Sequence, residues 1–194
     1  MIYFTSDQHF CHANIIKMCD RPFAGLDEMH ETLITNWNAV VDKRDEIYIL
    51  GDFLYKGNGQ SATNILNKLS GKKHLIKGNH EKYLNSPQFD STLYVWVKDY
   101  HELEYMDARF ILFHYPILEW AHCWRKSVHL YGHNHRPRKP VSEQWDKRAI
   151  NVGVDVNRFF PISAEAIYKI AFGESGVETV SENCNVKDTV VSGQ

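Results

Sequence analysis

The sequence predicts a single α/β domain in which helices pack outside a mixed β-sheet. Short apolar runs alternate with segments of helical periodicity in the first part of the chain, and strand-like runs follow one another closely after residue 90. The length of 194 residues suits one domain with a substantial core. Alternating strands and helices followed by strand-rich hairpins favour a mixed sheet flanked by helices.

The first half of the chain contains three expected strands and two expected helices. The strands are the apolar runs 1–6, 46–52 and 73–79. Apolar residues recur at helical spacing over 28–41, with Asp27 as the expected N-cap. A second helix is expected over 61–71, capped by Ser61 and closed near Gly71.

The second half is expected to be richer in strands. The runs 93–100, 101–106 and 108–114 indicate a meander, and strands over 128–133 and 148–156 follow. A helix is expected from Ser163 to Phe172. We expect the domain to span residues 1–180 and the polar residues 181–194 to form a frayed C-terminal tail.

Composition and charge exclude several classes of function. The net charge of -2 argues against a general nucleic-acid or membrane-surface binder, and no apolar run approaches the ~20 residues of a membrane-spanning helix. The N-terminus, MIYFTSDQHF, lacks the basic start and apolar core of a signal peptide, so we expect a cytoplasmic protein. The 4 cysteines form no CxxC pair and are expected to be reduced thiols rather than zinc ligands.

Polar residues of one chemical kind follow the expected strands at their carboxyl ends. They are Asp7 and His9, Asp52, Asn79 and His80, His114, and His133 and His135, with glycine at positions 51, 78 and 132. In open α/β sheets, ligands bind outside the carboxyl ends of the strands. These side chains can therefore converge although they lie far apart in the sequence.

Carboxylate, amide and imidazole donors without thiolates are typical of a transition-metal site. We expect two divalent ions; these donors fit Mn²⁺, Fe or Zn without choosing among them, and we take Mn²⁺ as the first choice, with Ni as a further alternative. The donors exceed what one ion requires if one carboxylate bridges a pair. Two ions ~3.5–4 Å apart can activate a water and stabilise both oxygens of an in-line displacement. The pattern therefore predicts phosphoester hydrolysis.

Five motifs occur between residues 7 and 135: Asp7-Gln8-His9, Gly51-Asp52, Gly78-Asn79-His80-Glu81, His114 and Gly132-His133-Asn134-His135. In kind and order they resemble the motifs of the calcineurin-like metallophosphoesterase superfamily. Each motif alone is weak, but the five together are highly specific. The stretches HFCHANII, RPF, HYPILEW and NVGVDV are similar to a group of small bacterial and phage phosphoesterases.

The resemblance implies a role for each motif residue. One metal ion would be held by Asp7, His9 and His135, a second by Asn79, His114 and His133, and Asp52 would bridge them. His80 is similar to the family's catalytic histidine, a general acid that protonates the leaving oxygen while a metal-bridging hydroxide attacks phosphorus. The implied fold is a four-layer sandwich of two mixed β-sheets flanked by helices.

The chain departs from the protein-phosphatase branch of this superfamily. Its segment 51–57 lacks the Asp and the phosphate-binding Arg of the GDxxDRG motif, so another residue must hold the phosphate. Our candidates are His12 and Arg21, with helix-start hydrogen bonding and a surface ion pair as the respective alternatives. Asn151 and Asp155 are candidates for orienting ligands or for solvated turn residues.

We expect a phosphodiesterase that acts on a small phosphoester, with a nucleotide as one candidate. The short chain leaves the site open and has little room for the additional DNA-binding segments of related nucleases. The alternatives are a phosphomonoesterase and a non-catalytic binding module on the same fold. A binding module would be expected to have lost ligands or the catalytic histidine, and here every position is filled.

Two further features have ordinary explanations. The basic residues Arg136, Arg138 and Lys139 lie in the stretch RPRKP, which we interpret as an exposed turn and not as a nucleic-acid site. The loop HYPILEWAHCWRKS carries Trp120 and Trp124. Packing over the sheet is the favoured interpretation of these tryptophans, and an aromatic rim for a base or sugar is the alternative.

Overall fold

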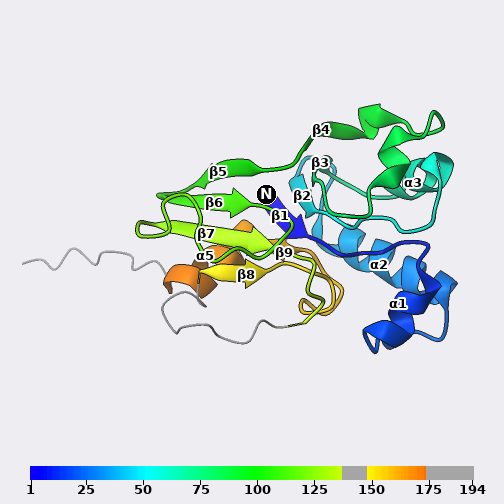
Figure 1. Ribbon diagram of the computed structural model, residues 1–194, viewed down its shortest axis with the longest axis horizontal. Helices are drawn as coiled ribbons and strands as arrows, with labels where there is room; N and C mark the ends of the chain where they lie inside the picture. Colours follow the sequence, from blue (N-terminus) through cyan, green and yellow to red (C-terminus); the bar gives the residue numbers. More distant parts are fainter. Residues whose placement is uncertain (137–147, 174–194) are drawn as a thin grey trace, which may run out of the picture.

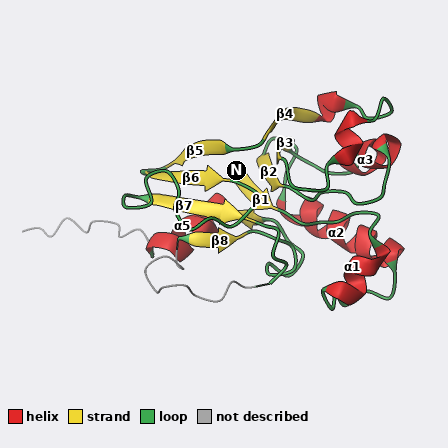
Figure 2. Ribbon diagram, viewed as in Figure 1, coloured by secondary structure: helices red, strands yellow, loops and turns green. Residues whose placement is uncertain are grey.

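The computed structural model describes residues 1–136 and 148–173 as two β-sheets that face each other, with helices on the outside (Figures 1 and 2). This arrangement confirms the predicted α/β class with two mixed sheets. The expected tail at 181–194 and the basic residues Arg138 and Lys139 lie outside the described residues. Within the described part of the chain, no helix has both the length and the apolar character required to span a bilayer.

The first sheet has the strand order β4-β3-β2-β1-β9. Its four parallel strands are β1 (Ile2–Thr5), β2 (Glu46–Leu50), β3 (Lys72–Ile76) and β4 (Tyr94–Lys98), and β9 (Ile162–Ser163) is antiparallel to β1. Parallel neighbours need crossover connections. The connections contain the helices α1 (Ala13–Met18), α2 (Leu26–Val40) and α3 (Gly59–Leu66) and the short 3₁₀ helices Lys82–Asn85 and Ser91–Leu93.

The second sheet has the order β5-β6-β7-β8. β5 (His101–Tyr105) and β6 (Ala108–Leu112) form an antiparallel hairpin, whereas β7 (Ser127–Tyr131) and β8 (Ala149–Asn151) run parallel to β6. The helix α5 (Ala164–Phe172) follows at the predicted place, and Ser163 caps it by accepting a hydrogen bond from the backbone of Ala166.

The core is divided by the alternation of side chains along the central strands. On one face of the first sheet, Tyr3, Ile47, Ile49 and Leu75 pack with residues of α2 and α3, such as Trp37 and Leu66. On the other face, Phe4, Tyr48, Leu50 and Ile76 meet Phe110, Leu112, Val128 and Leu130 of the second sheet. Figure 1 shows the same division, with α1, α2 and α3 on the side of the first sheet that faces away from the second.

Three local predictions were wrong. β4 belongs to the first sheet and β5 to the second, so the expected meander is broken where the chain passes from one sheet to the other. α2 begins at Leu26 after Gly25, so Asp27 lies in the first turn and is not the N-cap. Its negative charge there still stabilises the helix through the helix dipole. α3 is capped by Asn58, whose side chain accepts from the Ser61 backbone, and ends at Leu66.

Candidate metal centre

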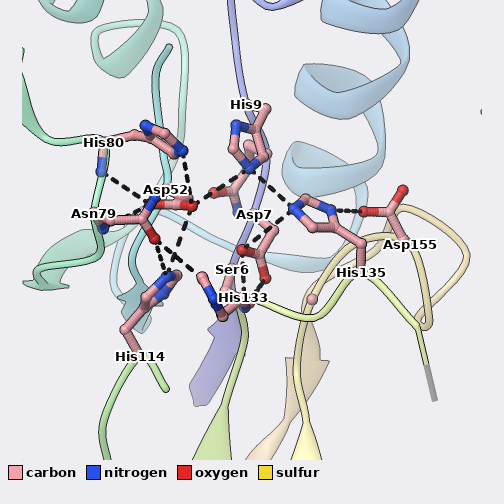
Figure 3. A network of polar contacts seen from close by, with 12 residues as sticks. Ser6, Asp7, His9, Asp52, Asn79, His80, His114, His133, His135 and Asp155 are labelled. Atoms are coloured by element: carbon pink, nitrogen blue, oxygen red, sulfur yellow. Dashed lines mark hydrogen bonds and ion pairs between the residues drawn. The ribbon is translucent and has the colours of Figure 1, made fainter. Parts of the chain in front are cut away.

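The carboxyl ends of five strands meet at one edge of the two sheets. β1, β2 and β3 are parallel in the first sheet, and β6 and β7 are parallel in the second. Backbone hydrogen bonds join the loops that follow them: Asp7 donates to Gly51, His9 donates to Asp52, and Gly132 donates to His114. The predicted residues therefore converge (Figure 3).

Five of the predicted metal ligands have a left-handed backbone conformation, which is uncommon for residues other than glycine. They are Asp7 (φ 59°), His9 (52°), Asp52 (55°), His133 (72°) and His135 (51°). Such conformations cost of order 1–3 kcal/mol each and cluster at functional sites. Their concentration here is a sign of function that is independent of the sequence motifs.

Two glycines of the motifs are required by close approach. A Cβ atom on Gly51, whose φ is +86°, would lie 2.4 Å from His114 Nδ1. A Cβ atom on Gly132 would lie 2.4 Å from Asp7 Oδ2 and 2.2 Å from Ser6 Oγ. Both glycines allow ligand side chains to pass directly against neighbouring backbone.

The first cluster consists of Asp7, His9 and His135, whose ligand atoms lie within 4.8 Å of one another. Nε2 of His9 and Nε2 of His135 face each other at 3.1 Å, and Asp7 Oδ1 lies 3.9 Å from His135 Nε2. Two imidazole nitrogens that face each other beside a buried carboxylate can share a proton or a metal ion. The donor set therefore fits a divalent cation.

The second cluster consists of Asp52, His114 and His133, again within 4.8 Å, and Asn79 joins it. Asn79 Oδ1 lies 3.2 Å from His114 Nε2 and 3.1 Å from His133 Nδ1. His114 Nδ1 lies 2.7 Å from the carbonyl oxygen of Leu50. Because a carbonyl only accepts, Nδ1 carries the proton and Nε2 is available as a ligand.

Asp52 lies between the two clusters. Its Oδ1 accepts hydrogen bonds from the backbone of Asn79 and His80, at 3.0 and 3.1 Å. Its Oδ2 lies 3.5 Å from His9 Nε2 and 3.6 Å from His114 Nε2 (Figure 3). One carboxylate oxygen thus faces a histidine of each cluster, as a bridging ligand must.

Burial shifts the pKa values of three candidate ligands, Asp7, His9 and His114. Burial raises the pKa of Asp7 to about 7, although His135 and the Ser6 hydroxyl act in the opposite direction. Burial, reinforced by repulsion from His135, lowers the pKa of His9 to about 2. Burial also lowers the pKa of His114. Both histidines are therefore neutral near pH 7, the state in which imidazole binds metals.

His80 lies beside the clusters without belonging to either. Its Nε2 is 3.8 Å from Asp52 Oδ2, and its side chain is 30% exposed. Its ring meets the ring of Tyr55 edge-on, with centroids 4.7 Å apart. A half-exposed imidazole at this position can exchange a proton with a bound substrate.

His12 lies on the same wall of the site as Tyr55. The two rings are 3.9 Å apart, and His12 is 5.3 Å from the ring of His9. Burial, with repulsion from His80 and Lys56, lowers the pKa of His12 to about 4. Its Nδ1 is buried and has no hydrogen-bond partner within the described residues. Tyr55 carried no motif and could not be identified from the sequence.

The prediction that Arg21 contacts phosphate is wrong. Its guanidinium group is buried behind the first cluster, where Nε and one terminal nitrogen donate to Asp155. The terminal nitrogens also donate to the carbonyl oxygens of Asp7 and Gln8 and contact the sulfur of Met29. All five N–H groups of a guanidinium are thereby occupied, so none is available to a substrate.

Two buried acids support the site from behind. Asp155 Oδ2 accepts from His135 Nδ1 at 2.7 Å, which supports the orienting role considered for Asp155. Glu81 accepts from the backbone of Phe53 and Gly78, at 3.1 and 2.8 Å, and so joins the loops after β2 and β3. Its only sequence signal was its position directly after His80.

Two other candidates do not reach the clusters. Asn151 accepts from the Gly153 backbone instead of a ligand. Trp120 packs with Ile111 on the outer face of the second sheet, and its Nε1 donates to Ser127. This agrees with the favoured interpretation of packing for Trp120, whereas Trp124 is exposed.

Comparison with known proteins identifies the family. The family model described as calcineurin-like phosphoesterase matches residues 1–152. The chain belongs to the calcineurin-like phosphoesterase family. The predicted family is thus confirmed, and membership supports metal-dependent hydrolysis of a phosphoester.

Relatives of this chain are small proteins that match along nearly their whole length. An uncharacterized protein of Methanocaldococcus jannaschii is 35% identical over 185 residues, which cover 93% of this chain and 97% of that protein. The Gene 66 protein of Mycobacterium phage L5 is 30% identical over 209 residues, covering 91% and 98%. A solved structure of a protein of unknown function from Aquifex aeolicus is similar, with a TM-score of 0.68, 30% identity and coverage of 88% and 98%.

Proposed function

We propose that this phosphoesterase binds two divalent metal ions and hydrolyses a small phosphodiester. The first ion would be held by Asp7, His9 and His135, and the second by Asn79, His114 and His133, with Asp52 as the shared ligand. The observation that carries the proposal is Asp52 Oδ2, which faces His9 on one side and His114 on the other. Bound ions would activate the attacking water and stabilise charge on the phosphoryl oxygens. Mn²⁺ is our first choice, with Fe, Zn and Ni as alternatives.

We assign His80 the role of general acid. Its position beside Asp52 Oδ2 and its partial exposure allow Nε2 to reach an oxygen on a phosphoryl group bound at the clusters. In the protonated form it would donate a proton to the leaving oxygen as the P–O bond breaks. Its ring is held by Tyr55 and not by a metal, which leaves the proton free to move.

His12 is the proposed substrate contact, since Arg21 has no donor to offer. Nδ1 of His12, which has no hydrogen-bond partner among the described residues, is available to a polar group of the substrate. Lys56 adds positive charge on this wall, because its ammonium group lies 5.5 Å from the centre of the Tyr55 ring. An imidazole, a lysine and a tyrosine together suit a phosphate that carries an aromatic or sugar substituent, such as a nucleotide.

The test is metal analysis followed by a substrate panel. We expect close to two transition-metal ions per chain and Mn²⁺-stimulated hydrolysis of bis-p-nitrophenyl phosphate. The panel also contains p-nitrophenyl phosphate and 2′,3′- and 3′,5′-cyclic nucleotides. Faster hydrolysis of the monoester would identify a phosphomonoesterase instead. Absence of both metal and activity would refute the proposal and favour a non-catalytic binding module.

A further inference from the structure

A buried ion pair lies directly behind the first cluster. Arg21 Nε is 2.7 Å from Asp155 Oδ1, and a terminal nitrogen of Arg21 is 2.8 Å from Asp155 Oδ2. The side chain of Arg21 is 0% exposed and that of Asp155 is 6% exposed. Two opposite charges are therefore held in a bidentate contact away from water, 134 residues apart in the chain.

The carboxylate of this pair fixes one ligand of the first cluster. Asp155 Oδ2 is 2.7 Å from His135 Nδ1. Because an ionised carboxylate only accepts, Nδ1 carries the proton, and in the neutral imidazole Nε2 then has the lone pair. Nε2 points at Nε2 of His9, 3.1 Å away (Figure 3). A carboxylate behind an imidazole fixes its tautomer and orientation and increases its basicity as a ligand.

The guanidinium of the pair fixes the other side of the same cluster. Arg21 donates to the carbonyl oxygen of Asp7 at 2.8 Å and to that of Gln8 at 2.9 Å. These carbonyls belong to the segment 7–9, in which the candidate ligands Asp7 and His9 have left-handed backbone conformations. Arg21 therefore links the segment that carries Asp7 and His9 to Asp155, which in turn contacts His135.

The second cluster has a different kind of support. Behind His114 lies the neutral carbonyl of Leu50, and no side-chain carboxylate is recorded at Nδ1 of His114 in the described residues. A neutral partner fixes the tautomer but increases the basicity of the imidazole less than a carboxylate does. The two clusters therefore differ in the charge behind one histidine of each: a carboxylate behind His135 and a neutral carbonyl behind His114.

We infer that Arg21 and Asp155 are positioning residues that give the first cluster the higher metal affinity of the two. This inference rests on the proposed function, because it assumes that both clusters bind metal. The pair contacts no substrate and lies behind the ligands. Its removal should therefore weaken one metal equivalent and leave the other.

Two variants of Asp155 separate charge from hydrogen bonding. Asp155→Ala removes both the acceptor for His135 and the partner of Arg21. Asp155→Asn keeps an amide oxygen that can accept from Nδ1 but removes the charge. Cys19→Ser tests the neighbouring thiol, because Cys19 Sγ lies within 4.8 Å of the ligand atoms of His135 and Asp155 and the three residues form a further group that could hold a metal ion.

The experiment is a titration of the metal-free proteins with Mn²⁺ against a competing chelator, with thermal melting as a check on folding. We expect two equivalents in the wild type and in Cys19→Ser. Asp155→Ala should bind the tighter equivalent about 10–100-fold more weakly, Asp155→Asn should show a smaller loss, and the weaker equivalent should be unchanged. If Asp155→Ala does not fold, Asp155→Asn alone decides.

The outcomes are distinguishable. A wild type that binds fewer than two equivalents overturns the proposed function. Two equivalents of unchanged affinity in both Asp155 variants would overturn the inference and leave the proposed function intact. Equal weakening of both equivalents would also overturn it, since the pair would then act on the whole fold. A loss of affinity in Cys19→Ser would assign the effect to the thiol instead.

Discussion

The two clusters of the candidate site differ in what stands behind their ligands. The first is buried and backed by the ion pair of Arg21 and Asp155. The second has the backbone carbonyl of Leu50 behind His114, and the side chain of Glu81 joins the loops that carry Asp52 and Asn79. A carboxylate behind an imidazole ligand increases its basicity more than a neutral carbonyl does. Two similar donor sets that differ in this way are expected, under the inference above, to hold metal with unequal strength.

The largest effect is expected from Asp52, whose carboxylate faces a histidine of each cluster. Asp52→Asn removes the negative charge between the clusters and replaces one carboxylate oxygen by an NH₂ group that repels a cation. We expect hydrolysis to fall by more than the ~10²–10⁴-fold typical of losing a general acid, and both metal equivalents to weaken. Metal analysis and initial rates on bis-p-nitrophenyl phosphate measure both.

Asp20→Asn is the control for this variant. Asp20 is exposed and has a φ of 51°, close to the 55° of Asp52, and asparagine tolerates this conformation well. The control should keep wild-type metal content and rate. If Asp52→Asn kept both metal ions, Asp52 would not be a ligand shared by the two clusters, and the clusters would be independent sites.

The next largest effect is expected at His80, which belongs to neither cluster. His80→Ala should lower kcat by about 10²–10⁴-fold and leave both metal equivalents bound. The loss should be smaller for p-nitrophenyl esters than for alkyl esters, because p-nitrophenolate leaves without protonation. His122→Ala removes an imidazole on an exposed loop and should not change this ratio. An equal loss for both leaving groups would contradict the role of general acid.

A smaller effect is expected at Glu81, the support of the second cluster. Glu81→Gln would place an amide NH₂ against the backbone donor of Phe53 or Gly78. We expect a loss of about 1–3 kcal/mol in the free energy of unfolding and weaker binding of the second metal equivalent only. Glu165→Gln on the surface of α5 should change stability by less than about 0.5 kcal/mol. If Glu81→Gln instead weakened binding of the first metal equivalent, the assignment of Glu81 to the second cluster would be wrong.

The convergence of the candidate ligands could be predicted from the sequence, and Asp155 was one candidate for orienting them, but the pairing of Asp155 with Arg21 and the contacts of Glu81 could not. Asp7, Asp52 and His133 follow apolar runs directly, and the geometry of a parallel sheet brings such strand ends together. Asp155 and Glu81 act through contacts that depend on how loops turn after the strands. Arg21 illustrates the limit: it is near His9 in the sequence, yet its side chain turns behind the ligands and pairs with Asp155.

The same limit applies to the fold. The apolar pattern predicted strands where β4, β5 and β6 lie, and this was correct in position. Periodicity reports which face of a strand is buried, not which neighbour it pairs with. The change of sheet between β4 and β5 is decided by packing of Phe4, Tyr48 and Ile76 against the second sheet, a contact between segments distant in sequence.

The smallest effect is expected at His30, which anchors the loop of the first cluster. His30 Nε2 accepts a hydrogen bond from the backbone of Cys11 at 2.9 Å, two residues beyond His9. Burial lowers the pKa of His30 below its ordinary value of 6.5. Between that lowered pKa and pH 6.5 the unfolded chain binds more protons than the native protein at this residue, so the free energy of unfolding falls as the pH falls.

His30→Gln keeps a hydrogen-bond acceptor but does not titrate. In metal-free protein, wild type should lose stability relative to His30→Gln below pH 6.5, at no more than about 1.4 kcal/mol per pH unit. Denaturant unfolding at several pH values measures this difference, in which contributions of Asp7 and His9 cancel because both proteins share them. If the free energy of unfolding varied with pH in the same way for both proteins, the hydrogen bond from the Cys11 backbone to His30 would not contribute to the pH dependence. A difference confined to low pH would show that the loop of the first cluster is stabilised by the hydrogen bond to neutral His30 as well as by the ion pair of Arg21 and Asp155.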